Sequence, residues 1–339
     1  MGTISDYKLL DSPYDYMQVY RNGELLTSTD NKTDESEKER FHNANVYYVG
    51  ALSDKLRLNV DADYVYSRLN HWQQVTETSR IDAAQEITHI QNDQRNRAAA
   101  FKGVLAWKVN ESNGFDFGTD FSKISSWGTS VNEEGKIADD RFKNKETKYA
   151  GFVSYRLSSE KWRGSVGLRY EYVHAINTDQ GEVKNKADYS DILPSLSLST
   201  SVGKVDLNLD FSSRVNRPSF RQLNNSVSYN NQYHYEQGNI YLKPQYVYDT
   251  EFSLNYGIID FKVDYQYIKD YIHPTVVAIT GKPGTVAWMS TNADRFQQLG
   301  AQCVVAPVIG CWRPTLTAGV YKPYFTLEYN GSETRYNHP

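Results

Sequence analysis

Apolar and polar residues alternate along several segments of this chain. In the clearest segment, 162–172, every second residue is Gly, Val, Leu or aromatic, and most of the residues between them are polar. Segments 56–66, 205–215 and 259–267 repeat the pattern. A period of two places each set of residues on one face of a β-strand. These segments therefore predict strands with one apolar and one polar face.

Weaker alternation extends the pattern over the rest of the chain. Eight further segments show it: 44–52, 98–108, 115–127, 147–157, 191–202, 246–257, 293–306 and 311–321. The total is about twelve strands of about ten residues, whereas soluble strands usually have about five or six. Ten residues tilted by about 45° span about 23 Å, which matches the apolar band of an outer-membrane barrel. We predict an all-β fold, an antiparallel meander that forms a transmembrane β-barrel or part of one.

The predicted connections alternate in length. Short polar turns follow every second strand, and long polar stretches separate the others, at about 68–97, 128–146, 174–190, 216–245 and 270–292. Residues 1–40 resemble a further long loop, with a small hairpin at Asn22-Gly23. Short turns are expected on the periplasmic side of such a barrel and long loops on the extracellular side.

Aromatic residues also follow the strand ends. Trp107, Trp162 and Trp312 lie beside short turns, whereas tyrosine pairs such as Tyr170 and Tyr172 lie where strands enter the long loops. Membrane interfaces select such belts. The high β-propensity of Tyr and Trp would explain their enrichment in any sheet, but not this placement.

Composition narrows the class of protein. Hydrophobic residues make up 39% of the 339 residues, and no run of 18 apolar residues occurs, so a helical membrane protein is excluded. The net charge is −4 and no basic stripe stands out, so we expect no nucleic-acid partner. Residues 1–20 do not resemble a signal peptide. We expect residues 1–339 to be one incomplete barrel domain of an exported protein, with outer-membrane lipid as its surroundings.

The polar parity of the strands supplies the candidate functional residues. No nucleophile elbow, phosphate-binding loop, metal-spaced Cys/His set or dinucleotide turn is present, so we expect no catalysis, cofactor or bound metal. Charged residues on the inward parity could line a water-filled lumen and tune its selectivity. The candidates are Arg169, Glu171, Asp206, Asp210, Arg214, Lys262 and Asp264.

Two stretches in 216–245 carry a family resemblance. An Arg-Pro-x-Phe-x-x-Leu-Asn stretch precedes a Gly-Asn-Ile-x-Leu-Lys-Pro-Gln stretch, and a strand follows. The pair resembles TonB-dependent receptors, whose second stretch usually has Pro at position 240 and Glu at position 245. The matching residues are Arg217, Pro218, Leu223, Asn224, Gly238, Asn239, Leu242, Lys243 and Pro244. The rest of the chain is similar to the Bacteroidetes-type outer-membrane β-barrel family, which forms the C-terminal part of such receptors.

The resemblance implies active uptake across the bacterial outer membrane. In such receptors TonB pulls on a plug domain inside a 22-stranded barrel, and the cargo is an iron chelate, vitamin, sugar or peptide. No region of this chain resembles a plug, and about twelve strands either close on themselves or form part of a larger sheet. A passive porin or structural barrel is the alternative, and the motif residues could also serve only to shape an external loop. A barrel-type enzyme or a soluble β-sandwich is less compatible with the pattern.

Overall fold

Strands make up most of the computed structural model, which describes residues 2–21, 23–224, 227–279, 284–329 and 332–336. The strands are β1 (Gly2–Asp11), β2 (Tyr14–Arg21), β3 (Glu24–Ser53), β4 (Leu56–Ser79), β5 (Gln85–Lys108), β6 (Asn113–Asn132), β7 (Asp140–Ser158), β8 (Trp162–Asp179), β9 (Glu182–Val202), β10 (Val205–Asn216), β11 (Val227–Asn231), β12 (His234–Gln237), β13 (Gln245–Tyr256), β14 (Ile259–Ala278), β15 (Val286–Val305), β16 (Leu316–Tyr329) and β17 (Ser332–Tyr336). Among the described residues, no helix is long or apolar enough to cross a bilayer.

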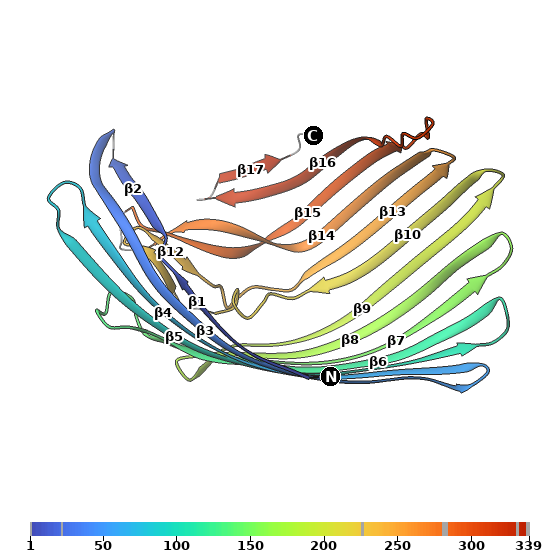
Figure 1. Ribbon diagram of the computed structural model, residues 1–339, viewed down its shortest axis with the longest axis horizontal. Helices are drawn as coiled ribbons and strands as arrows, with labels where there is room; N and C mark the ends of the chain where they lie inside the picture. Colours follow the sequence, from blue (N-terminus) through green and yellow to red (C-terminus); the bar gives the residue numbers. More distant parts are fainter. Residues whose placement is uncertain (1, 22, 225–226, 280–283, 330–331, 337–339) are drawn as a thin grey trace.

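The strands form one curved sheet that is antiparallel except where β12 pairs with β15 (Figure 1). From β3 to β10 each strand pairs with the next in sequence, β10 then pairs with β13, and the meander continues to β17. All twelve strands expected from the alternation are present, and the predicted all-β meander is confirmed.

In the observed strand register, the apolar residues of adjacent strands lie opposite one another and form continuous rows across the sheet. One row crosses eight strands: Leu157, Gly164, Leu198, Leu209, Phe252, Val263, Ala301 and Val320. A neighbouring row, displaced by one residue along each strand, has the opposite parity: Arg156, Ser165, Ser197, Asp210, Glu251, Asp264, Gly300 and Tyr321. Because successive side chains point to opposite faces, the sheet has an apolar face and a polar face.

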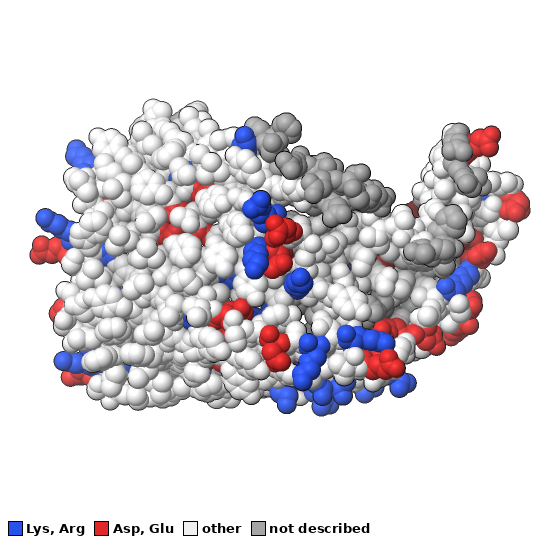
Figure 2. All heavy atoms as spheres, turned by 180° about the vertical axis from the view of Figure 1, so that it is seen from behind, with Lys and Arg blue, Asp and Glu red and all other residues white. Residues whose placement is uncertain are grey.

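The apolar row faces outward, and the polar row faces the concave side. Val166 and Leu168 on the outer parity are 52% and 50% exposed, whereas Glu171 on the inner parity is 7% exposed. Seen from behind, charged side chains are sparse over the half of the molecule nearest the short turns (Figure 2). An outward apolar face requires hydrocarbon around it, because a soluble protein would bury these rows in its core.

The predicted long loops are wrong at four of the five positions. Residues 68–79 and 85–97 are the continued halves of β4 and β5, joined by a short turn, and 128–146, 174–190 and 270–292 are likewise mostly strand. The strands continue to pair beyond the apolar band, where the outer face contacts water and the inner face contacts water or the connection 217–244. Period-two alternation ends there because neither face has to be apolar. The stretch 217–244 is the exception and remains a long connection containing β11 and β12.

The N-terminal region also differs from the prediction. Residues 1–40 were expected to form a loop, but β1 and β2 both pair with β3 along its outer edge. The hairpin expected at Asn22-Gly23 is present, with Arg21 opposite Glu24, although Asn22 itself lies outside the described residues. Gly23 has a φ of +84°, which suits such a turn. At the other end, β16 begins at Leu316 rather than near 311.

The described part of the sheet does not close. The pairings found there leave β1 and β2 as one edge and β17 as the other, and none joins the two edges. The termini lie on opposite sides of the opening in Figure 1.

Candidate functional site

The concave face carries the charged residues expected to face a lumen. Near the short turns, the Ser201 hydroxyl donates to Asp206 at 2.5 Å. Further along, Asp210 and Asp264 line a hollow of about 470 Å³ on β10, β13 and β14. Lys262 lines the same hollow and forms an ion pair of 2.5 Å with Glu251. This part of the face can hold water and polar solutes.

Not every charge in this section has an opposite charge beside it. Arg214 pairs with Asp249 on the adjacent strand. Asp210 and Asp264, by contrast, form no ion pair with any residue that the structure describes. Asp264 lies near Lys262 without forming an ion pair with it, so its carboxylate and that of Asp210 keep oxygens that can contact a solute in the hollow.

Arg169 and Glu171 belong to a second, more buried cluster on the concave face of β8, further from the short turns. Arg169 contacts Glu171 at 2.8 Å and Asp120 at 3.0 Å. The other oxygen of Glu171 pairs at 2.9 Å with Arg217, which also lies 3.3 Å from Asp191. The side chains of Glu171 and Asp191 are 9% and 6% exposed, so these charges depend on their partners for solvation.

Arg217 is also the first residue of the sequence motif. It follows β10 and anchors the start of the connection 217–244 to β8 and β9 on the inner wall. Arg221, four residues further on, is 90% exposed, and its one ion pair among the described residues is with Glu236 of the same connection. We call residues 217–244 the inward loop, because its contacts lie with the concave side of the sheet.

The two halves of the motif pack against each other. A Cβ at Gly238 would lie 2.0 Å from the carbonyl oxygen of Asn224, so no larger residue fits there. The next residue, Asn239, donates its backbone N–H to Gln222 at 2.6 Å and its side-chain amide to the Ser290 carbonyl at 3.1 Å. The Gly-Asn pair thus joins the Arg-Pro half of the motif to β15.

The remaining motif residues shape or anchor the loop. Leu223 closes a turn by donating to Ser219 at 3.1 Å, and Pro218 precedes that turn. Leu242 is 3% exposed. Lys243 donates its N–H to the Asn292 side chain at 2.9 Å and accepts from it at 3.0 Å, and Pro244 leads into β13.

The tip of the inward loop reaches the opposite wall. Tyr229 is 1% exposed and packs against Val75 and Ile90 of β4 and β5. Its hydroxyl donates to Glu77, and burial followed by this hydrogen bond raises the pKa of Tyr229, so the phenol stays protonated. Beside it, β12 pairs in parallel with the part of β15 that β16 leaves free. The loop therefore bridges strands from both halves of the sheet.

A second hollow lies beneath the bridge. It has a volume of about 700 Å³ and is lined by Glu37 and His71 on one wall and by Trp288 and Ser290 on the other. The inward loop contributes Arg221, Gln222, Asn224, Val227, Ser228, Glu236, Gln237 and Gly238. The tip of the inward loop meets β4 at Gln73 and Glu77, which lie nearer the turn 80–84 than His71 does. The inward loop thus lies across part of the concave face and lines this hollow.

Sequence patterns did not identify the residues that receive the loop. Glu77, Ser290 and Asn292 lie in stretches expected to be loops, and Tyr229 was one polar-loop tyrosine among many. Only the family motif marked 217–244 as special. The contacts that fold the loop inward join residues of separate segments, for example 26 positions apart in Arg217 with Asp191 and 152 positions apart in Tyr229 with Glu77.

One group of side chains resembles a metal site. Ligand atoms of His89, Glu133 and Glu134 lie within 4.8 Å of one another. Glu134, however, already accepts from the His89 N–H at 2.7 Å and contacts its ring at 2.6 Å. Burial alone would raise the pKa of Glu134, but these hydrogen bonds outweigh it and lower the pKa. We therefore interpret these contacts as an anchor that fixes the turn 133–139 to β5.

Several solved structures share this fold. HasR, the hemophore receptor of Serratia marcescens, matches 96% of this chain over 62% of its own length, with a TM-score of 0.51 and 10% identity. The copper transporter OprC matches 95% of this chain over 62% of its own, with a TM-score of 0.52 and 9% identity. BauA, the ferric preacinetobactin receptor of Acinetobacter baumannii, matches 97% over 53%, with a TM-score of 0.52 and 12% identity.

This chain therefore spans between about half and two thirds of each of these structures, and the likeness concerns the fold. No curated protein matches it. The model of the outer membrane protein β-barrel family matches residues 51–338, which covers all strands from β4 to β17. The chain belongs to the outer membrane protein β-barrel family, and its place is the bacterial outer membrane.

Proposed function

We propose that this chain is part of the barrel wall of a TonB-dependent receptor that takes up a nutrient across the outer membrane. The observation that carries the proposal is the inward loop, which holds the receptor-like motif and crosses the concave face from β8 and β9 to β4 and β15. A receptor must block passive flow until its cargo is bound and energy is supplied. A segment anchored to β4 through Tyr229 and to β15 through Asn239 suits that requirement.

The cargo is a small polar or charged nutrient in this proposal. HasR, OprC and BauA are by their names a hemophore receptor, a copper transporter and a ferric siderophore receptor. Cargo of these kinds, or a vitamin, sugar or peptide, would pass the concave face, where Asp210 and Asp264 are available for contact. The proposal assigns no catalytic role to the chain.

The free sheet edges indicate that further strands are needed. In hydrocarbon an unpaired backbone N–H or C=O costs several kcal/mol, so the edge stretches 46–53 of β3 and 316–324 of β16, which β1, β2 and β17 do not cover, require neighbours in the membrane. We propose that other strands of the same receptor pair with both edges and that a plug, on which TonB acts, lies inside.

A passive porin is the second candidate. The water-accessible hollow on β10, β13 and β14 favours it, because a polar wall suits free diffusion equally well. The two candidates differ in energy dependence and in the role of the inward loop. Only a receptor loses uptake when TonB is removed.

Uptake by intact cells tests the proposal. A strain lacking the gene for this protein would be grown with heme, ferric siderophore, cobalamin, oligosaccharide or peptide as the limiting nutrient, with and without TonB. We expect growth on one of these to require both the gene and TonB. Uptake that needs the gene but persists without TonB would refute the receptor and establish the passive pore.

A further inference from the structure

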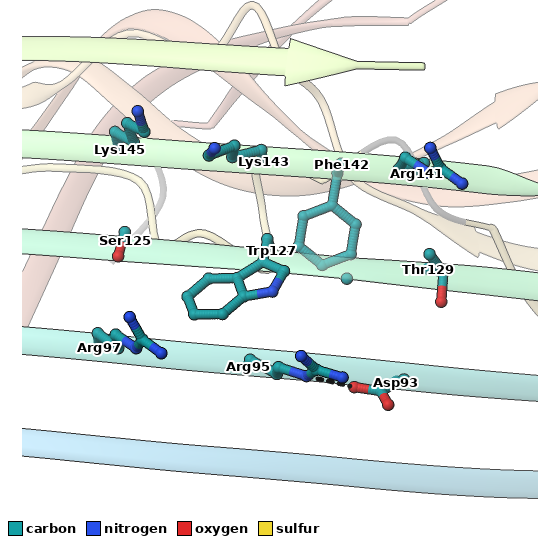
Figure 3. A pocket seen from close by; sticks show the side chains of 11 residues that line it. Asp93, Arg95, Arg97, Ser125, Trp127, Thr129, Arg141, Phe142, Lys143 and Lys145 are labelled. Atoms are coloured by element: carbon teal, nitrogen blue, oxygen red, sulfur yellow. Dashed lines mark hydrogen bonds and ion pairs between the residues drawn. The ribbon is translucent and has the colours of Figure 1, made fainter. Parts of the chain in front are cut away.

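A cluster of cations lies on the outer face of β5, β6 and β7. Its members share the outward parity: Arg95, Arg97, Arg141, Lys143 and Lys145. They line a hollow of about 640 Å³ together with Trp127 (Figure 3). We call these five residues the outer basic cluster. The sequence does not reveal it, because the cations come from strands about 50 residues apart.

The cluster begins where the apolar band ends. Arg97 and Lys145 lie in one cross-strand row, ten residues along their strands from the row that contains Trp107 and Tyr155 near the short turns. Ten residues at about 45° correspond to about 23 Å, close to the height of the apolar band of about 25 Å. The outward side chains between the two rows include exposed Phe101, Phe117, Tyr149 and Val153. The cations therefore stand at the outer-leaflet headgroups.

Most of the cluster lacks an internal counter-charge. Arg95 lies 3.4 Å from Asp93, but the other four form no ion pair with any carboxylate in the described ranges. Arg141, Lys143 and Lys145 are exposed and follow one another on β7 (Figure 3). Arg97 instead stacks on aromatic rings, 5.1 Å from Trp127 and 5.7 Å from Tyr66. Four like charges at this spacing repel one another unless an anion lies between them.

We propose that the outer basic cluster binds the phosphate groups of a phosphorylated glycolipid in the outer leaflet of the membrane. Arginine and lysine both recognise phosphate, and basic residues at the headgroup level attract anionic lipids. The apolar surface directly below the cluster would contact the acyl chains of the same molecule. A soluble anion would gain nothing from that surface, and this favours the lipid as the ligand.

Lipid retention by the purified protein tests the proposal. The full-length protein would be placed in phosphatidylcholine nanodiscs with a small fraction of phosphorylated lipid A, and bound glycolipid would be counted by native mass spectrometry. Dephosphorylated lipid A and inorganic phosphate serve as the comparison ligands. We expect the phosphorylated lipid to be retained at least tenfold more strongly than the dephosphorylated one, and millimolar inorganic phosphate not to displace it.

A matched pair of variants locates the site. The triple variant Arg141→Glu, Lys143→Glu, Lys145→Glu should lose at least tenfold in retention, because each cation near a charged lipid surface contributes about fivefold. The control variant changes three exposed lysines of the opposite, short-turn side by the same charge: Lys55→Glu, Lys161→Glu and Lys204→Glu. We expect the control to retain lipid within twofold of the unaltered protein.

Three results would overturn the proposal. They are equal retention of the two lipid A forms by the unaltered protein, displacement of the lipid by inorganic phosphate, and equal loss in both triple variants. The first comparison requires no substitution, so it remains decisive even if the triple variant does not fold.

Discussion

The loss of folding free energy caused by a charge on the outer face tests whether that face contacts lipid. Leu168 is 50% exposed on the apolar parity of β8, between Val153 and Pro194 of the neighbouring strands. It is six residues from Trp162, or about 14 Å along the membrane normal at a tilt of about 45°. That is close to the middle of an apolar band about 25 Å high. Leu168→Arg should therefore destabilise the membrane-embedded protein by about 2–4 kcal/mol.

The control places the same residue on the other face at the same height. Ser195 lies next to Pro194 on β9, with the opposite parity, and is exposed on the concave side. Ser195→Arg should cost less than about 1 kcal/mol, because its guanidinium reaches water. Equilibrium unfolding in lipid vesicles, followed by tryptophan fluorescence, gives both free energies. Equal costs for the two variants would refute the assignment of the faces.

The remaining predictions concern the inward loop and its surroundings. Arg217→Ala should destabilise the protein by about 3–5 kcal/mol, since it leaves the buried Asp191 without an ion pair and Glu171 with Arg169 alone. Arg221→Ala should be almost neutral, and similar unfolding midpoints for the two variants would contradict the buried cluster. Gly238→Ala should cost about 1–3 kcal/mol through overpacking and make the loop cleavable by protease on intact cells; unchanged resistance would argue against the tight turn. Because the pKa of Glu134 is lowered, its anchoring of the His89 amide is fully present above the ordinary value of about 4.3 and is lost as the pH falls through the lowered pKa. Hydrogen-exchange protection of that amide should fall with it, and constant protection from pH 6 to pH 3 would contradict this.

The membrane-spanning halves of the strands were predictable from the sequence. In β8 and β10, one face contacts hydrocarbon and the other contacts water, so apolar and polar residues alternate along the sequence of each strand. Residues 68–79 of β4 and 85–97 of β5 show no such alternation. Their outer face contacts water, and their inner face packs in part against the inward loop at Val75 and Ile90. Neither face requires a regular apolar alternation, so many polar sequences satisfy the same backbone pairing, and the segments looked like loops.

The site was predictable only in part. Parity placed Asp210, Lys262 and Asp264 on one face, because their positions follow from the strands that carry them. The inward fold of 217–244 depends on contacts between distant segments, such as Tyr229 with Glu77. The outer basic cluster likewise exists only after β5, β6 and β7 are in register. No local pattern encodes either feature.

Solvent accessibility along one strand tests the central claim most directly. After both free cysteines, Cys303 and Cys311, are replaced by Ser, single cysteines at 206–211 of β10 would be spin-labelled in lipid vesicles. Accessibility to oxygen should peak at 207, 209 and 211, and accessibility to a water-soluble nickel chelate should peak at 206, 208 and 210. Accessibilities that vary without this period of two, or with the two reagents exchanged, would contradict a sheet whose apolar face lies in lipid.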